Sequence, residues 1–171
     1  KAYVPLSFTD MREIGVRGGV QRTIYFRPII TSLTEDITPE WNKQSYYGRT
    51  DQVATYMSTM RTIFLGFELH ASSREDVEII YKKLNWLTSL TYPEYDAELL
   101  LKSGPVCRMR VGDVISGRNR LGLPGILDNV NFDYSDSIWE LDKGSKAPRS
   151  VKVSISFHVL HDRIIGRNAK G

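Results

Sequence analysis

The segment with the clearest potential for chemistry is Gly48-Arg49-Thr50-Asp51, which directly follows Tyr46 and Tyr47. A guanidinium, a hydroxyl and a carboxylate within four residues could form an active-site loop held in place by the strand that follows. The same side chains could instead form a contact between two copies of the protein, because aromatic residues and arginine dominate the energetics of protein interfaces. The rest of the sequence has to decide between these two readings.

Recognisable catalytic and metal-binding motifs are missing from the sequence. His158 and His161 lie three residues apart on a predicted strand and therefore point to opposite faces. There is no Cys-x-x-Cys or His-Glu-x-x-His pattern for zinc, and no Gly-x-Ser-x-Gly pattern for a serine nucleophile. The glycine-rich stretches 17–22 and 116–125 match neither a phosphate-binding loop nor a dinucleotide fingerprint. We therefore expect no catalytic residue, metal or cofactor; an enzyme of unrecognised type is the weakest alternative.

Nucleic-acid binding is the stronger alternative, and it depends on clustered arginines. The chain has 23 basic and 20 acidic residues, a net charge of +3, which is a mild excess. Phosphate binding needs several positive charges on one surface. The candidates are Arg108, Arg110, Arg118, Arg120, Arg163, Arg167 and Lys170, and they are diluted by Asp113, Asp128, Asp133 and Asp136. This mixture favours a solvated face over a nucleic-acid-binding β module.

Length and composition describe a single domain with a core. The 171 residues are 41% hydrophobic and 11% aromatic, and no apolar run is long enough to span a membrane. The one cysteine, Cys107, cannot form an internal disulfide, which fits a reducing compartment. Its alternation with apolar neighbours predicts a buried side chain on a strand.

One helix is predicted after residue 72. Ser72 and Glu75 have capping-box spacing, and Pro93 ends the pattern. An apolar stripe at helical spacing then predicts the face that packs on the core: Val77, Ile80, Tyr81, Leu84 and Leu87.

The remaining elements are predicted to be strands that alternate with period two. The stretches 59–71, 105–117, 125–136 and 150–162 each separate apolar from polar residues, which is typical of antiparallel sheets with one wet face. Pro28 places the strand around it at an edge, and the polar residues 34–44 are expected to form a loop. The fold class is therefore α+β, mainly antiparallel, a β-sandwich or barrel with one packed helix. We expect an N-terminal arm or edge strand over 1–22, a domain over 23–162 and a basic tail over 163–171.

Five segments in order carry a resemblance to a known group of proteins: residues 46–71, 84–95, 103–117, 122–142 and 146–162. Together they resemble the tube-like baseplate and tail proteins of contractile-tailed bacteriophages, near the tail-tube initiators and tube-to-baseplate connectors. The resemblance implies a tail-tube-like fold of two antiparallel sheets and one helix. It also implies a non-catalytic ring, most simply a homohexamer, within the virion and assembled in the host cytoplasm.

The resemblance also implies partners and a channel. The partners are further copies of the chain, the tail-tube protein, baseplate hub or wedge proteins, the tape-measure protein in the lumen, and DNA in transit. The short loop of the opening paragraph is then expected at a subunit interface, through Trp41, Tyr46, Tyr47, Arg49, Asp51 and Trp139; the alternative is that these aromatics fold back as local core. The face expected to line the channel is Asn129, Asn131 and Asp133, because it is neutral to acidic and does not hold phosphate; the alternative face is Lys152, Ser154, Ser156 and His158.

Overall fold

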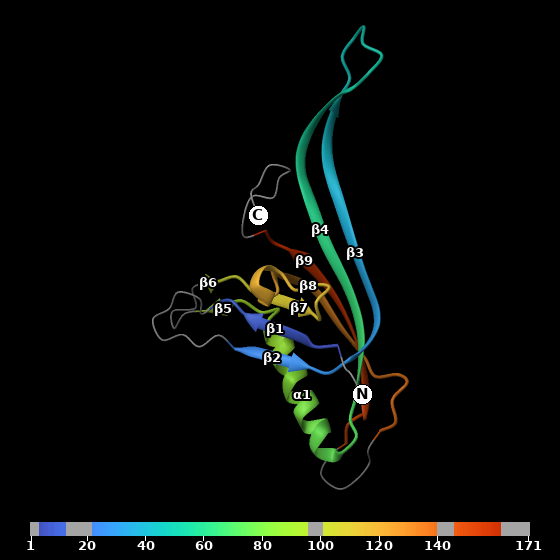
Figure 1. Cartoon of the computed structure of the whole chain (residues 1–171), viewed down its shortest axis with the longest axis vertical. Coiled ribbons are helices and arrows are strands. Elements are labelled where there is room, and N and C mark those ends of the chain that lie inside the picture. Colours follow the sequence, from blue (N-terminus) through green and yellow to red (C-terminus); the bar gives the residue numbers. More distant parts are fainter. Residues whose placement is uncertain (1–3, 13–21, 96–100, 140–145, 162–171) are drawn as a thin grey trace.

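The computed structural model describes residues 4–12, 22–95, 101–139 and 146–161, and within them it shows a mostly antiparallel β protein with one α-helix. Figure 1 shows a body of strands and helix from which two long strands project. In chain order the elements are β1 (Leu6–Asp10), β2 (Thr23–Phe26), β3 (Ile29–Gln44), β4 (Val53–His70), α1 (Arg74–Ser89), β5 (Glu94–Tyr95), β6 (Leu101–Ser103), β7 (Cys107–Val111), the short turn η1 (Arg118–Arg120), β8 (Leu123–Asp133) and β9 (Ser150–Val159).

Seven strands form one sheet in the order β2-β1-β7-β8-β9-β4-β3. Its two edge strands, β2 and β3, are separated in the chain only by Arg27 and Pro28. Because so short a link spans roughly 10 Å, the sheet must curve until its edges approach each other. The antiparallel α+β fold and the edge position of the strands around Pro28 are confirmed. The sandwich or barrel detail stays a prediction, since β2 and β3 are not paired with each other among the described strands.

The core lies on the concave side of this sheet. Alternate residues of β4 and β9 face it, including Ile63, Phe67 and Phe157, all of them almost completely buried. The helix closes the core from the other side through Leu84 and Leu87. The predicted apolar faces of these elements are confirmed, and so is the buried position of Cys107 on β7.

The helix begins one residue later than the sequence indicated. Ser73, not Ser72, is the N-cap, and its hydroxyl accepts from the backbone of Asp76 while the Asp76 carboxylate accepts from the backbone of Ser73. Both serines and both acids satisfy the sequence pattern, so only the backbone geometry distinguishes them. No helix among the described residues is long and apolar enough to cross a membrane.

Two segments differ from their predicted form. Within the predicted arm or edge strand 1–22, β1 is an interior strand that pairs with both β2 and β7, and Leu6 and Phe8 are fully buried. The predicted loop 34–44 is the outer part of β3. β1 alternates, with Leu6 and Phe8 on one face, but over only five residues, and the outer part of β3 is exposed on both faces and shows no period. Residues 17–21 of the glycine-rich stretch and the basic tail 163–171 lie outside the described residues.

A β-bulge corrects the predicted faces of β8. The register against β9 shifts between Leu127 and Asn129, so Asp128 is the extra residue. Leu127 is buried in the core, and after the bulge Val130 and Phe132 pack against the same core. An unbroken alternation over 125–136 predicts Ile126 on the face of Val130 and Phe132, but the bulge places it on the other face, opposite His158. The expected wet face after the bulge, beginning at Asn129, is exposed as predicted.

Candidate subunit interface

The longest feature of the molecule is a two-stranded ribbon, defined here as residues 37–61. It is the part of β3 and β4 beyond Thr62, the last β4 residue that pairs with β9. Figure 1 shows it rising from the body as the cyan and green strands. The eight residues from Ile37 to Gln44 alone span about 26 Å at a strand's rise per residue.

One face of the ribbon, here called the apolar face, continues the core-facing side of the sheet and carries Ile37, Trp41 and Tyr56, although Arg61 and Lys43 also lie on it. Directly opposed residues share a face, and opposed pairs alternate along the strands. Ile37 pairs with Arg61, two positions beyond the buried Ile63, and on this same side Trp41 pairs with Tyr56. The Trp41 and Tyr56 rings meet edge to face, with centroids 5.4 Å apart. A bulge at Met57 keeps both aromatics on this side.

The opposite face of the ribbon is more polar, although Met60 and Val53 also lie on it. It carries the opposed pairs Thr38–Met60, Glu40–Ser58 and Asn42–Thr55, and the Ser58 hydroxyl donates to Glu40 at 3.1 Å. The ribbon is therefore amphipathic, although neither face touches the body.

No third strand or helix covers the apolar face among the described residues. Ile37 keeps 62% of its surface exposed, Trp41 49% and Tyr56 52%. A two-stranded hairpin is marginally stable alone in water, and an exposed apolar stripe of this kind marks an interaction site. The ribbon therefore has the composition of a surface that another chain covers.

The ribbon ends in the loop that opened the sequence analysis. The backbone N–H of Arg49 donates to Tyr46 at 3.2 Å, and Gly48 takes the left-handed conformation that the turn needs. Tyr46 donates to Gln44 at 2.8 Å, and Tyr47 is fully exposed. These tip residues are held by local bonds and contribute nothing to the core.

The structure therefore gathers five of the six predicted interface residues on the ribbon: Trp41, Tyr46, Tyr47, Arg49 and Asp51. They are all exposed, so the alternative that they fold back as local core is wrong. Trp139 lies elsewhere, after β8, where it forms an isolated bridge with Pro148. It is also exposed.

The two faces considered for a channel turn out to be one surface. Asn129 opposes Ser156, Asn131 opposes Ser154, and Asp133 opposes Lys152. On the other side of β9, β4 adds Phe64 and Glu68 to the same surface. A shallow hollow of about 280 Å³ lies here between β3, β4, β8 and β9. The sequence could not show this, because the register between distant strands decides it.

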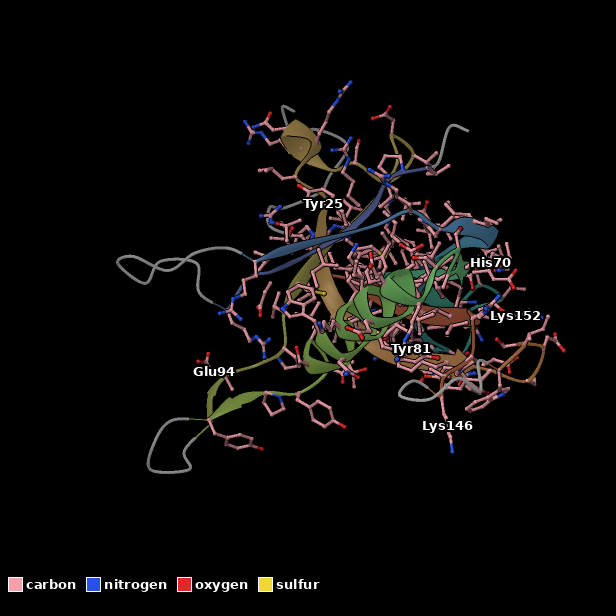
Figure 2. The ribbon with its side chains drawn as sticks, turned by 90° about the horizontal axis from the view of Figure 1, so that it is seen from below. Tyr25, His70, Tyr81, Glu94, Lys146 and Lys152 are labelled. Atoms are coloured by element: carbon pink, nitrogen blue, oxygen red, sulfur yellow. The ribbon has the colours of Figure 1, made fainter. Side chains whose placement is uncertain are left out.

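Only one basic residue, Lys152, and one histidine, His158, stand among these paired polar residues. Lys152 donates to the Asp136 carboxylate, and this bond raises the pKa of Lys152. Figure 2 shows Lys152 at the side of the body, near the segment that follows β8. Hydroxyls and amides otherwise dominate, and the two carboxylates of Asp133 and Glu68 make the surface neutral to acidic.

Three arginines of the predicted cluster contact groups near their own loop. Arg108 donates to the Gly122 carbonyl at 3.3 Å, and Arg110 donates to the Gly112 carbonyl at 3.1 Å. Arg110 and Arg120 both approach Asp113, at 3.5 and 4.0 Å. These arginines thus already have a carboxylate or backbone oxygens as partners. Arg163, Arg167 and Lys170 lie outside the described residues.

The described residues offer little for catalysis or metal binding. No group of three or more His, Cys, Asp or Glu side chains comes together among them in a way that could hold a metal ion. His70 and His158 lie at opposite ends of the β4–β9 pairing. Burial raises the pKa of the Cys107 thiol to about 12, with a smaller contribution from Asp10, so this thiol stays protonated at neutral pH.

Sequence reasoning missed a groove of about 530 Å³ between the two sheet edges and α1. Its walls include Tyr25, Ile29 and Ile79, all about half exposed or more, and the cation of Lys83 donates to the Tyr25 carbonyl at 2.8 Å. Figure 2 shows Tyr25 and His70 on two sides of this region. The sequence does not reveal this groove, because its lining residues come from three separate segments of the chain.

No known protein family matches this chain, and no curated protein matches it either.

Proposed function

We propose that this chain is a structural component of a contractile bacteriophage tail, forming a ring that joins the tail tube to the baseplate hub. The observation that carries the proposal is the ribbon. Its apolar face continues the core side of the sheet beyond the body and is left exposed, which a neighbouring copy in a ring would cover. The fold is antiparallel β with one packed helix, as the resemblance implies.

A ring also needs an inner surface, and the merged face of β8 and β9 is the best candidate. A channel for the tape-measure protein and DNA must let them pass without binding tightly, since phosphate contacts repeated around a ring would add through avidity. The residues Asn129, Asn131 and Asp133, opposed by two serines and one ion-paired lysine, meet this requirement. We place this face toward the lumen and assign the chain no catalytic role.

The mass of the protein in solution tests the proposal. Arg49→Glu combined with Tyr47→Ala at the tip, and Trp41→Ser on the apolar face, should weaken self-association while the circular dichroism spectrum stays unchanged. The matched control is Asn42→Ser on the polar face, which should assemble like the wild type. If the tip variant and Trp41→Ser both give the same oligomer mass as the wild type at every concentration, the ribbon is not the interface.

The alternative is a nucleic-acid-binding β module, and the same protein can distinguish it. Such a module should bind DNA with an affinity that falls steeply with salt, and Arg118→Ala should reduce that slope. We expect weak DNA binding of the proposed ring protein, with no change of self-association in the presence of DNA.

A further inference from the structure

The ribbon, residues 37–61, has two free edges as well as two faces. β3 is the outermost strand of the sheet, and β4 loses its other neighbour beyond Thr62, where its pairing with β9 ends. Figure 1 shows β3 and β4 rising from the body with no other labelled strand beside them. A free edge carries a row of unpaired backbone donors and acceptors, and a long one is a template for a strand of another chain.

Pro39 interrupts the free edge of β3. The pairing of β3 with β4 continues without a shift past Pro39, which lies opposite Thr59. Proline has no N–H, so this continuous ladder requires the Pro39 nitrogen to face away from β4, towards the free edge. Because bonded and non-bonded pairs alternate along an antiparallel ladder, the backbone groups of Ile37 and Trp41 face the same edge. At Pro39 that row lacks a donor, and the proline ring occupies space that a further strand would need.

The bulge at Met57 interrupts the free edge of β4 at nearly the same level. Thr59 pairs with Pro39 and Tyr56 pairs with Trp41, so the β4 residues whose backbone groups face the free edge are here three positions apart instead of two. The Tyr56 and Thr59 hydroxyls share a hydrogen bond of 2.7 Å across the bulge, which holds it in place. A straight strand does not match this spacing, so it could not pair along the whole edge.

The edge of β3 is also interrupted closer to the body. A register shift against β4 makes Thr31 an extra residue, which is a second bulge. The longest stretch of the β3 edge without proline or bulge is residues 32–38, and it carries the carboxylates of Glu35 and Asp36. Proline, bulges and charged side chains are the usual means by which proteins protect the edges of sheets, and β3 has all three.

We infer that Pro39 and the Met57 bulge prevent the ribbon from adding a strand of another chain at either edge. Neither feature strengthens the ribbon itself, since a proline adds no ladder bond and a bulge disrupts the ladder. With Ile37, Trp41 and Tyr56 exposed, unprotected edges would make the ribbon a site of edge-to-edge aggregation. The interruptions leave the faces of the ribbon as the surfaces that a partner covers. This inference concerns the free chain and does not depend on the proposed ring.

A matched pair of threonine substitutions tests the edge of β3. Pro39→Thr and Asn42→Thr introduce the same β-favouring side chain and leave the net charge unchanged, but only Pro39→Thr adds a donor to the free edge. Aggregation is followed by thioflavin T fluorescence and by the amount of protein that sediments. Pro39→Thr should aggregate at least about fivefold faster than the wild type, and Asn42→Thr within about twofold of it. Equal rates for the two variants overturn the inference.

Moving the proline separates edge protection from a general loss of stability. In the Pro39→Thr protein, Ile37→Pro places a proline two residues along the same edge, and Ile37→Ala is its matched control because it removes the same apolar side chain. Ile37→Pro should return aggregation to within about twofold of the wild-type rate, whereas Ile37→Ala should leave it fast. No difference between these two proteins overturns the role of the β3 edge.

Deletion of Met57 tests the edge of β4. The deletion removes the extra residue and restores regular spacing along that edge, so it should accelerate aggregation as Pro39→Thr does. An unchanged rate after the deletion overturns the role of the bulge. The proposed ring is judged separately, by the oligomer mass of the face and tip variants, so either idea can fail without the other.

Discussion

The body and the ribbon are built from the same two strands, yet they differ in almost every physical property. Where β4 pairs with both β3 and β9, alternate side chains such as Ile63 are fully buried. Beyond Thr62 the strands keep their pairing with each other and lose all other neighbours, and Ile37 is mostly exposed. The comparison teaches that the third strand and the helix, not the pairing of β3 with β4, create burial.

The largest expected difference between body and ribbon comes from two isoleucines. Ile63→Ala should lower the free energy of unfolding by about 2–5 kcal/mol, because it leaves a cavity in a closed core. Ile37→Ala removes the same atoms from an exposed face and should change it by less than about 0.5 kcal/mol. Urea denaturation of the monomer measures both.

The same pair also separates stability from assembly. Ile37→Ala should weaken self-association, although it leaves the monomer as stable as before. A loss of several kcal/mol in the Ile37→Ala monomer would show that the ribbon packs on the body, and the comparison would then break down.

Two glycines are expected to give the next largest difference. Gly125 in β8 has no room for a side chain, since an added Cβ would come within 2.6 Å of the Phe157 ring. Gly48 at the ribbon tip has open space around it but a φ of +80°. Gly125→Ala should therefore destabilise the fold by about 1–3 kcal/mol or more. Gly48→Ala should cost about 1 kcal/mol, confined to the tip.

An asparagine at the tip provides the control, because asparagine tolerates the left-handed conformation better than alanine. Gly48→Asn should recover part of the Gly48→Ala loss, as measured by hydrogen exchange of the amides around residues 44–53. At Gly125 asparagine should be worse than alanine, since space is the constraint there.

The smallest effects are expected from two ion pairs. In the body, Arg12 donates through Nε and Nη2 to both oxygens of Asp10, at 2.6–3.0 Å, and through Nη1 to the Tyr92 carbonyl at 2.9 Å. At the base of the ribbon, Arg61 donates to Glu35 on a more exposed surface. Double-mutant cycles should give about 1–2 kcal/mol for the first pair and about 0.2–1 kcal/mol for the second.

The body pair should also respond to acid. Burial alone would raise the pKa of Asp10, but the hydrogen bonds from Arg12 lower it overall, below its ordinary value of 3.8. The stabilisation is therefore present above pH 3.8 and is lost as the pH falls through the lower, folded value. Arg12→Ala should remove this acid dependence, whereas Arg61→Ala should leave it unchanged. If the free energy of unfolding of the two variants depends on pH in the same way, the Arg12–Asp10 pair is no more coupled to folding than the Arg61–Glu35 pair.

The sequence was sufficient for the elements whose burial is periodic. The stripe from Val77 to Leu87 and the alternation of β9 each report one buried and one wet face, so the helix, the strand and the antiparallel class could be predicted. The exposed aromatics of the ribbon tip were also recognised as interface candidates, since their composition does not depend on strand or loop geometry.

The remainder depends on neighbours that the sequence does not reveal. Residues 34–44 were predicted as a loop because a strand exposed on both faces shows no period. The bulge at Asp128 inverted the face of Ile126, and it is visible only in the register with β9. The merging of the β8 and β9 polar faces likewise follows from strand pairing, which composition does not encode.

The uninterrupted course of β4 from the ribbon tip into the body has a mechanical consequence. A pull along the ribbon axis is carried by β4 directly into its pairing with β9, which runs over nine residue pairs from Thr62–His158 to His70–Ser150. Such a load slides two antiparallel strands past each other and strains their hydrogen bonds together, whereas peeling would break them one after another. The ribbon is thus anchored by the whole β4–β9 pairing, so a pull on its tip meets the resistance of all nine residue pairs together.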